Sequence, residues 1–172
     1  MTLQWQGKFL EVHKTGTWEY AARVGAMGAA VILAITDARE IVLVEQFRHA
    51  HGRRCIELPA GLIGDTDAGD TAIAGGEAAI TAAARELHEE TGYVADSWES
   101  LGTFATSPGM SSEMFELFRA WGLVRVADGG GIDGEDITVH IVPLGGLTDF
   151  LTERRAAGCI IDCRLIVVMG LV

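Results

Sequence analysis

Positively charged residues are scarce in this sequence of 172 residues. It has 13 lysines and arginines against 24 aspartates and glutamates, and its net charge is −11. Such an excess of negative charge argues against tight, general binding to nucleic acid or to an anionic membrane. The length suits one domain with a sizeable core, so we expect residues 1–172 to form a single domain.

Cysteine is also rare, and long apolar runs are missing. Cys55, Cys159 and Cys163 are an odd number without the spacing of a disulfide framework. The spacing of Cys159 and Cys163 could clamp a metal ion, but no histidine or cysteine lies near them in the sequence. We therefore interpret them as small buried hydrophobic residues. No segment reaches the length of a membrane span, and the N-terminus lacks a signal-peptide pattern. These absences predict a cytoplasmic protein without a membrane partner.

Hydrophobic patterning predicts strands in most of the chain and a few helices. Strands are expected over residues 3–12, 17–22, 29–35, 41–44, 54–58, 98–105, 114–121 and 137–142. The turn at 36–39 predicts a hairpin between two of these strands. Helices are expected over residues 77–91 and around 147–151, and a final helix or strand over 160–169. The segment 65–76 is rich in glycine, alanine and aspartate and is expected to be a mobile loop, a lid or a spacer.

The most informative segment is Arg85-Glu86-Leu87-His88-Glu89-Glu90. On a helix, Glu86, Glu89 and Glu90 crowd one narrow arc, where like charges repel. A hard divalent cation such as Mg²⁺ would relieve this repulsion, because it binds carboxylate oxygens. Arg85 stands four residues before Glu89 and can hold its carboxylate. The alternative interpretation is a solvated acidic face.

With Glu77 before this segment and Gly92-Tyr93 after it, the order of residues resembles the Nudix box. The Nudix family hydrolyses nucleoside diphosphates linked to another group. The resemblance implies an α/β fold, a Nudix-type α/β/α sandwich around a mixed sheet, here with an N-terminal β region. The family's opening glycine best matches Gly61, so the loop after Gly64 is about ten residues longer than usual.

Segments outside the box resemble the ADP-ribose pyrophosphatase group of this family. They are Trp18-Glu19-Tyr20 with Arg23, Glu45-Gln46-Phe47-Arg48, Glu57-Leu58-Pro59-Ala60-Gly61, Ser107-Pro108-Gly109 and Glu135-Asp136-Ile137. The resemblance implies hydrolysis of ADP-ribose to AMP and ribose 5-phosphate. It also implies that about two or three Mg²⁺ ions, or Mn²⁺ ions, are bound. Another nucleotide sugar, such as GDP-mannose, is the alternative substrate. A catalytically silent nucleotide-sensing module is a further alternative.

The same resemblance implies the site residues. Metal ligands are expected at Ala60 (through its backbone carbonyl), Glu86, Glu89 and Glu90. Catalytic roles are expected at Arg85, Glu89 and Glu135. Substrate contacts are expected at Trp18, Glu19, Arg23, Arg48, Glu57, Gly61, Leu62, Pro108, Gly109, Met110 and Glu113.

Several of these roles also have a physical rationale. The guanidinium groups of Arg23 and Arg48 suit phosphate oxygens. Trp18 can stack on adenine, although a tryptophan in a strand is as often a core residue. We expect Glu135 to be the general base because a glycine-rich loop precedes it, and Glu113 is the alternative.

The group is typically homodimeric, with the N-terminal region crossing to the partner. We therefore expect a homodimer to which residues 1–25 contribute. Trp5, Phe9 and Trp18 supply apolar surface that a monomer would leave uncovered.

Overall fold

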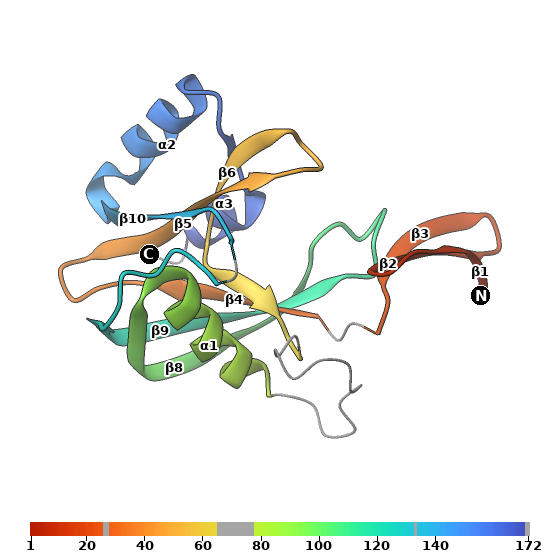
Figure 1. Cartoon of the computed structure of the whole chain (residues 1–172), viewed down its shortest axis with the longest axis horizontal. Helices are drawn as coiled ribbons and strands as arrows, with labels where there is room; N and C mark the ends of the chain where they lie inside the picture. Colours follow the sequence, from red (N-terminus) through yellow and green to blue (C-terminus); the bar gives the residue numbers. More distant parts are fainter. Residues whose placement is uncertain (26–27, 65–77, 133, 171–172) are drawn as a thin grey trace.

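The computed structural model describes residues 1–25, 28–64, 78–132 and 134–170. Two four-stranded mixed sheets lie at its centre, with one core packed under helix α1 (Ala79–Thr91) and a second core under two C-terminal helices (Figure 1). A three-stranded sheet formed by the N-terminus stands apart from this body. The arrangement confirms the expected α/β/α layers and the N-terminal β region.

The N-terminal sheet is antiparallel and consists of β1 (Thr2–Gln6), β2 (Leu10–Thr15) and β3 (Trp18–Arg23). The prediction of one strand over 3–12 is wrong, because the chain turns after β1 and the Gly7 N–H donates to the Leu10 carbonyl at 2.8 Å. The sheet joins the body through the backbone of Ala21, which hydrogen-bonds to Met110 and Ser112.

The first central sheet has the order β7-β4-β9-β8, from β7 (Ala60–Leu62), β4 (Ala29–Ala34), β9 (Met114–Arg125) and β8 (Tyr93–Ala105). Every residue of β4 is buried. Val31 and Leu33 belong to the core under the C-terminal helices, whereas Ala30 and Ile32 belong to the core under α1. A strand covered on both faces needs apolar side chains throughout, which explains the continuous run in the sequence.

The second central sheet has the order β10-β5-β6-β11, from β10 (Ile137–Pro143), β5 (Glu40–Arg48), β6 (Arg53–Glu57) and β11 (Ile160–Ile161). The predicted turn at 36–39 is confirmed, because the Thr36 N–H donates to the Glu40 carbonyl at 2.9 Å, but the predicted hairpin does not extend along β4 and β5. Only Ile35 and Ile41 form an antiparallel bridge, after which the two strands enter different sheets. Strand β4 pairs with the distant β9 and β5 pairs with the distant β10, although β5 also pairs with β6, which follows it in the sequence.

The remaining helices are the short 3-10 helix η1 (Leu144–Gly146), α2 (Leu147–Ala156) and α3 (Cys163–Val168). Helix α1 ends at Gly92, whose φ of 75° is left-handed, and β8 begins at the next residue, earlier than predicted. The predicted final element over 160–169 is two elements, because Asp162 ends β11 and caps α3 by accepting from the Arg164 N–H at 2.8 Å. None of the described helices is long and apolar enough to cross a membrane.

Two sequence predictions concern residues that the structure does not describe. Glu77 and the long loop over 65–76 lie outside the described residues.

All three cysteines are free thiols, but only Cys55 is buried. The prediction that Cys163 is buried is wrong, because it lies exposed in the first turn of α3.

Candidate active site

Helix α1 turns its carboxylates toward strand β7. Its small and apolar side chains Ala82, Ala83 and Leu87 are buried against the sheet. Gly61 of β7 lies so close to the helix that a Cβ atom there would stand 1.8 Å from the Glu86 carboxyl carbon. Only glycine leaves room for Glu86 in this position.

Arg85 binds two of the box carboxylates. Its Nη1 donates to Glu86 Oε1 at 2.8 Å and to Glu89 Oε2 at 3.0 Å, as the helical spacing predicts for Glu89. Its Nη2 donates to the Leu62 carbonyl at 3.3 Å, which ties the helix to β7. Arg85 therefore reduces the repulsion between the two carboxylates and fixes their orientation.

Glu90 is the most buried of the three carboxylates, with 5% of its surface exposed. It accepts a hydrogen bond from the Ala60 N–H at 3.0 Å. Burial raises the pKa of Glu90 to about 8, and the charges of Glu86, Glu135 and Glu57 add to the increase, against the opposing Ala60 hydrogen bond. Burial likewise raises the pKa of Glu86, although Arg85 opposes the shift. Both carboxylates lack sufficient positive charge around them.

A glycine-rich loop brings Glu135 to these carboxylates. The Gly130 N–H donates to the Glu90 carbonyl at 2.8 Å and the Gly131 N–H to the Glu89 carbonyl at 3.0 Å, so the loop binds the C-terminal end of α1. Glu135 follows just before β10, is exposed, and accepts from the Ile132 N–H at 3.1 Å. Its charge acts on both Glu86 and Glu90.

Two predicted substrate-binding arginines are already paired with predicted substrate-binding glutamates. Arg48 donates from Nε and Nη2 to the two carboxylate oxygens of Glu57, both at 2.6 Å. Arg23 donates from Nε to Glu113 Oε1 at 2.5 Å. Sequence spacing does not indicate these pairs. The charges of Arg48 and Glu90 interact, which places Arg48 beside the box.

The other predicted substrate residues lie on the side of the N-terminal sheet. Trp18 is 57% exposed, and Glu19 forms an ion pair with Lys14 at 3.0 Å. The exposed turn that contains Pro108, Gly109 and Met110 joins the same sheet through Ala21. The structure thus groups the box residues with Ala60, Gly61, Leu62 and Glu135, and it pairs Arg48 of β5 with Glu57 of β6. The other predicted substrate residues are tied to the N-terminal sheet: Trp18, Glu19, Arg23, Pro108, Gly109, Met110 and Glu113.

The donor chemistry of the box fits a hard cation. Within the described part of the chain, which omits Glu77, no group of three or more histidine, cysteine, aspartate or glutamate side chains is arranged to hold a metal ion by itself. Glu86 and Glu89 share Arg85 instead. Carboxylate oxygens with raised pKa values beside the backbone of Ala60 are nevertheless the ligands that Mg²⁺ prefers.

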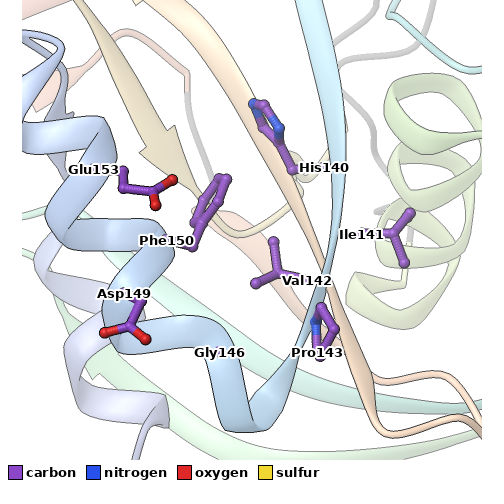
Figure 2. Close-up of a pocket in the computed structure, with 8 residues that line it drawn as sticks. All are labelled: His140, Ile141, Val142, Pro143, Gly146, Asp149, Phe150 and Glu153. Carbon is purple, nitrogen blue, oxygen red and sulfur yellow. The ribbon is translucent and has the colours of Figure 1, made fainter.

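A cavity of about 300 Å³ lies elsewhere, between β10 and α2 (Figure 2). It is lined by His140, Ile141, Val142, Pro143, Gly146, Asp149, Phe150 and Glu153. In Figure 2 the side chain of Ile141 points from β10 toward α1, and it packs in the core under that helix. Strand β10 therefore separates this cavity from the box carboxylates.

Comparisons with known proteins agree with this geometry. Residues 26–156 match the NUDIX domain. An ADP-ribose pyrophosphatase of Mycobacterium tuberculosis (strain ATCC 25618 / H37Rv) is 43% identical over 99 residues, which are 58% of this chain and 44% of that protein. The methanol dehydrogenase activator of Bacillus methanolicus is 38% identical over 130 residues, 74% of this chain and 64% of the relative. The ADP-sugar pyrophosphatase of Mus musculus is 38% identical over 160 residues, 84% and 66% of the two chains.

Among solved structures, an ADP compounds hydrolase superposes with a TM-score of 0.64 and 20% identity, covering 88% of this chain and 80% of that one. This likeness shows the fold. The chain spans about half of the length of the Mycobacterium relative and somewhat under two thirds of the Bacillus methanolicus relative.

Proposed function

Because the chain belongs to the NUDIX domain family, we propose that it is a metal-dependent hydrolase that cleaves ADP-ribose to AMP and ribose 5-phosphate. The observation that carries this proposal is the box itself, in which Glu86 and Glu89 share the guanidinium of Arg85, and the buried Glu90, held by the Ala60 N–H, has a pKa of about 8. Two of the relatives are named for ADP-ribose or ADP-sugar cleavage, which supports the choice of substrate.

Nudix hydrolases generally require a divalent metal ion. We assign Mg²⁺, with Mn²⁺ as the alternative, in about two or three ions held by the box glutamates and the Ala60 carbonyl. When bound, the metal polarises the diphosphate and makes a water molecule more acidic.

The side chains of the protein supply the remaining steps. Glu135 takes the proton of the attacking water, whose oxygen forms a bond to phosphorus while the bond to the bridging oxygen breaks. Arg48 and Arg23 orient phosphate oxygens, and Trp18 stacks on the adenine. Arg85 keeps Glu86 and Glu89 in place.

A panel of nucleotide sugars, incubated with the protein and Mg²⁺ in ¹⁸O water, tests the proposal. Mass spectrometry should find AMP and ribose 5-phosphate as the products of ADP-ribose, and ADP-ribose should have the highest kcat/KM of the panel. The product that contains the ¹⁸O atom identifies the phosphorus that water attacks. Preference for GDP-mannose would overturn the substrate, and no turnover of any compound would favour a silent sensing module.

We also propose that residues 1–172 act as one domain and assemble as a homodimer through residues 1–25. The exposed apolar side chains of the N-terminal sheet support this assembly. They are Met1, Leu3, Trp5, Phe9, Leu10 and Trp18. The three free cysteines support a location in the reducing cytoplasm.

A further inference from the structure

A chain of alternating charges connects helix α3 to Arg48. Asp162 binds Arg164 through Nε at 2.8 Å and also through Nη2. Arg164 Nη2 reaches Glu57 Oε2 at 3.4 Å, and Glu57 in turn holds Arg48 through two hydrogen bonds of 2.6 Å. Arg164 and Glu57 are 107 residues apart in sequence, so no local spacing indicates this contact.

The network is anchored on both sides. Glu57 is 2% exposed at the end of β6. Asp162 follows β11, which pairs with β6, and its N–H donates to the Ile56 carbonyl at 3.0 Å. Arg164 also lies over the ring of Phe115, 5.8 Å from its centroid. A buried carboxylate such as Glu57 requires this paired positive charge, because an uncompensated charge in the interior is strongly destabilising.

Arg48 is the only member of the network that is substantially exposed, with 41% of its side chain open to solvent. Its Nε and Nη2 bind Glu57, and within the described residues Nη1 has no hydrogen-bond partner. Because the guanidinium is planar, the carboxylate of Glu57 fixes the position of the N–H groups that remain available. Arg164 binds the same carboxylate and therefore helps to fix the position of Glu57.

We propose that Asp162 and Arg164 are positioning residues that act through Glu57 to hold Arg48 against the substrate diphosphate. This inference rests on the proposed function, because it takes Arg48 to contact the diphosphate. Neither residue touches the substrate itself.

Charge balance gives the network a second effect. Arg48 and Arg164 offset Glu57 and Asp162, so the four side chains have no net charge. Removal of Arg164 leaves one excess negative charge at the pair formed by Glu57 and Arg48. An additional negative charge at this place opposes the binding of an anionic substrate.

The variant Arg164→Gln tests the inference. We expect its KM for ADP-ribose to rise about tenfold while kcat changes less than about threefold, because the diphosphate is held less well but the box carboxylates are untouched. Arg164→Lys keeps the charge but cannot bridge two carboxylates in the same way, so its KM should rise about threefold. Arg155→Gln is the matched control, since Arg155 is exposed on α2 and forms no ion pair within the described part of the chain.

Binding provides a readout besides turnover. Calorimetry with the non-hydrolysable α,β-methylene analogue of ADP-ribose should show the same order of Kd values: wild type and Arg155→Gln tightest, then Arg164→Lys, then Arg164→Gln. Circular dichroism checks that each variant is folded.

The outcomes separate the two proposals. If wild type hydrolyses ADP-ribose but Arg164→Gln has the KM and Kd of Arg155→Gln, the positioning role is wrong and the proposed function stands. If wild type does not hydrolyse ADP-ribose, the proposed function fails first. Should Arg164→Gln not fold, Arg164→Lys decides: a raised KM and Kd supports the inference, and wild-type values overturn it.

Discussion

Glu90 is a carboxylate in a place where its charge is unfavourable. It is buried and has a pKa of about 8, above the ordinary value of 4.5. Between these two pH values the folded protein retains a proton that the unfolded chain has lost. The stability of the metal-free protein therefore falls as the pH rises from about 4.5 to about 8. A bound cation needs the ionised form, so the affinity for metal rises over the same range.

The variant Glu90→Gln should remove this pH dependence. We expect urea unfolding in EDTA to show that wild type loses a free energy on the order of a few kcal/mol between about pH 5 and 8.5, and that Glu90→Gln loses clearly less. The variant should also lose most of its turnover, because one anionic metal ligand is missing. Glu99→Gln, at an exposed position of β8, is the control. Equal slopes for wild type and Glu90→Gln would contradict the argument.

Substitution of Glu135 and of Glu113 distinguishes the roles of these two residues. We expect Glu135→Gln to lower kcat at least about a hundredfold with little change in KM, because loss of a general base typically has this effect. Glu113 is bound to Arg23 near the N-terminal sheet, so Glu113→Gln should act mainly on KM. Stopped assays over a range of ADP-ribose concentrations give kcat and KM for both variants. A larger kcat loss in Glu113→Gln would exchange the two roles.

At the scale of elements, the end of α1 and the loop that follows β9 form one unit. Gly129 has a φ of 72°, and a Cβ atom at this position would stand 2.4 Å from the Thr91 carbonyl carbon. The loop can therefore approach the helix only with glycine here, and this approach carries Glu135 toward Glu90.

Replacement of Gly129 by alanine should move the loop and lower kcat by about tenfold or more, while the helix itself remains folded. Gly158→Ala is a matched control, because Gly158 also has a positive φ, 93°, but a Cβ atom there meets nothing within 4 Å. Both variants share the backbone strain, so only the clash distinguishes them. Equal kcat values for the two would show that the contact between loop and helix does not position Glu135.

The elements also show what the sequence can predict. The box helix follows from local spacing, because residues three and four apart share a helix face, and Arg85 binds Glu89 as expected. Strand partners are set by burial across the whole chain, so the predicted hairpin between β4 and β5 ends after the single bridge between Ile35 and Ile41. The ion pairs of Glu57 and Glu113 with arginines depend on these partners, and no spacing indicates them.

For the whole molecule, the exposed N-terminal sheet predicts a dimer. Light scattering at micromolar concentration should give twice the mass of one chain. The double substitution Trp5→Ser and Phe9→Ser should weaken the dimer, because both side chains are more than half exposed in the single chain. Val124→Ser with Val126→Ser changes an equally exposed apolar pair and should leave the mass unchanged. A fully active monomer would remove the N-terminal sheet from the assembly.

The parallel pairing of β11 with β6 has a consequence for biosynthesis. Strands β4, β5 and β6 leave the ribosome early, yet Leu165 and Val168 of α3 complete their core and Arg164 completes the surroundings of Glu57. A nascent chain that ends before Ile160 therefore presents an uncovered sheet face and a buried carboxylate with only one partner. The core under α3 and the ion pairs of Glu57 can therefore form fully only after residues 160–168 have been translated, and until then the nascent chain is open to aggregation.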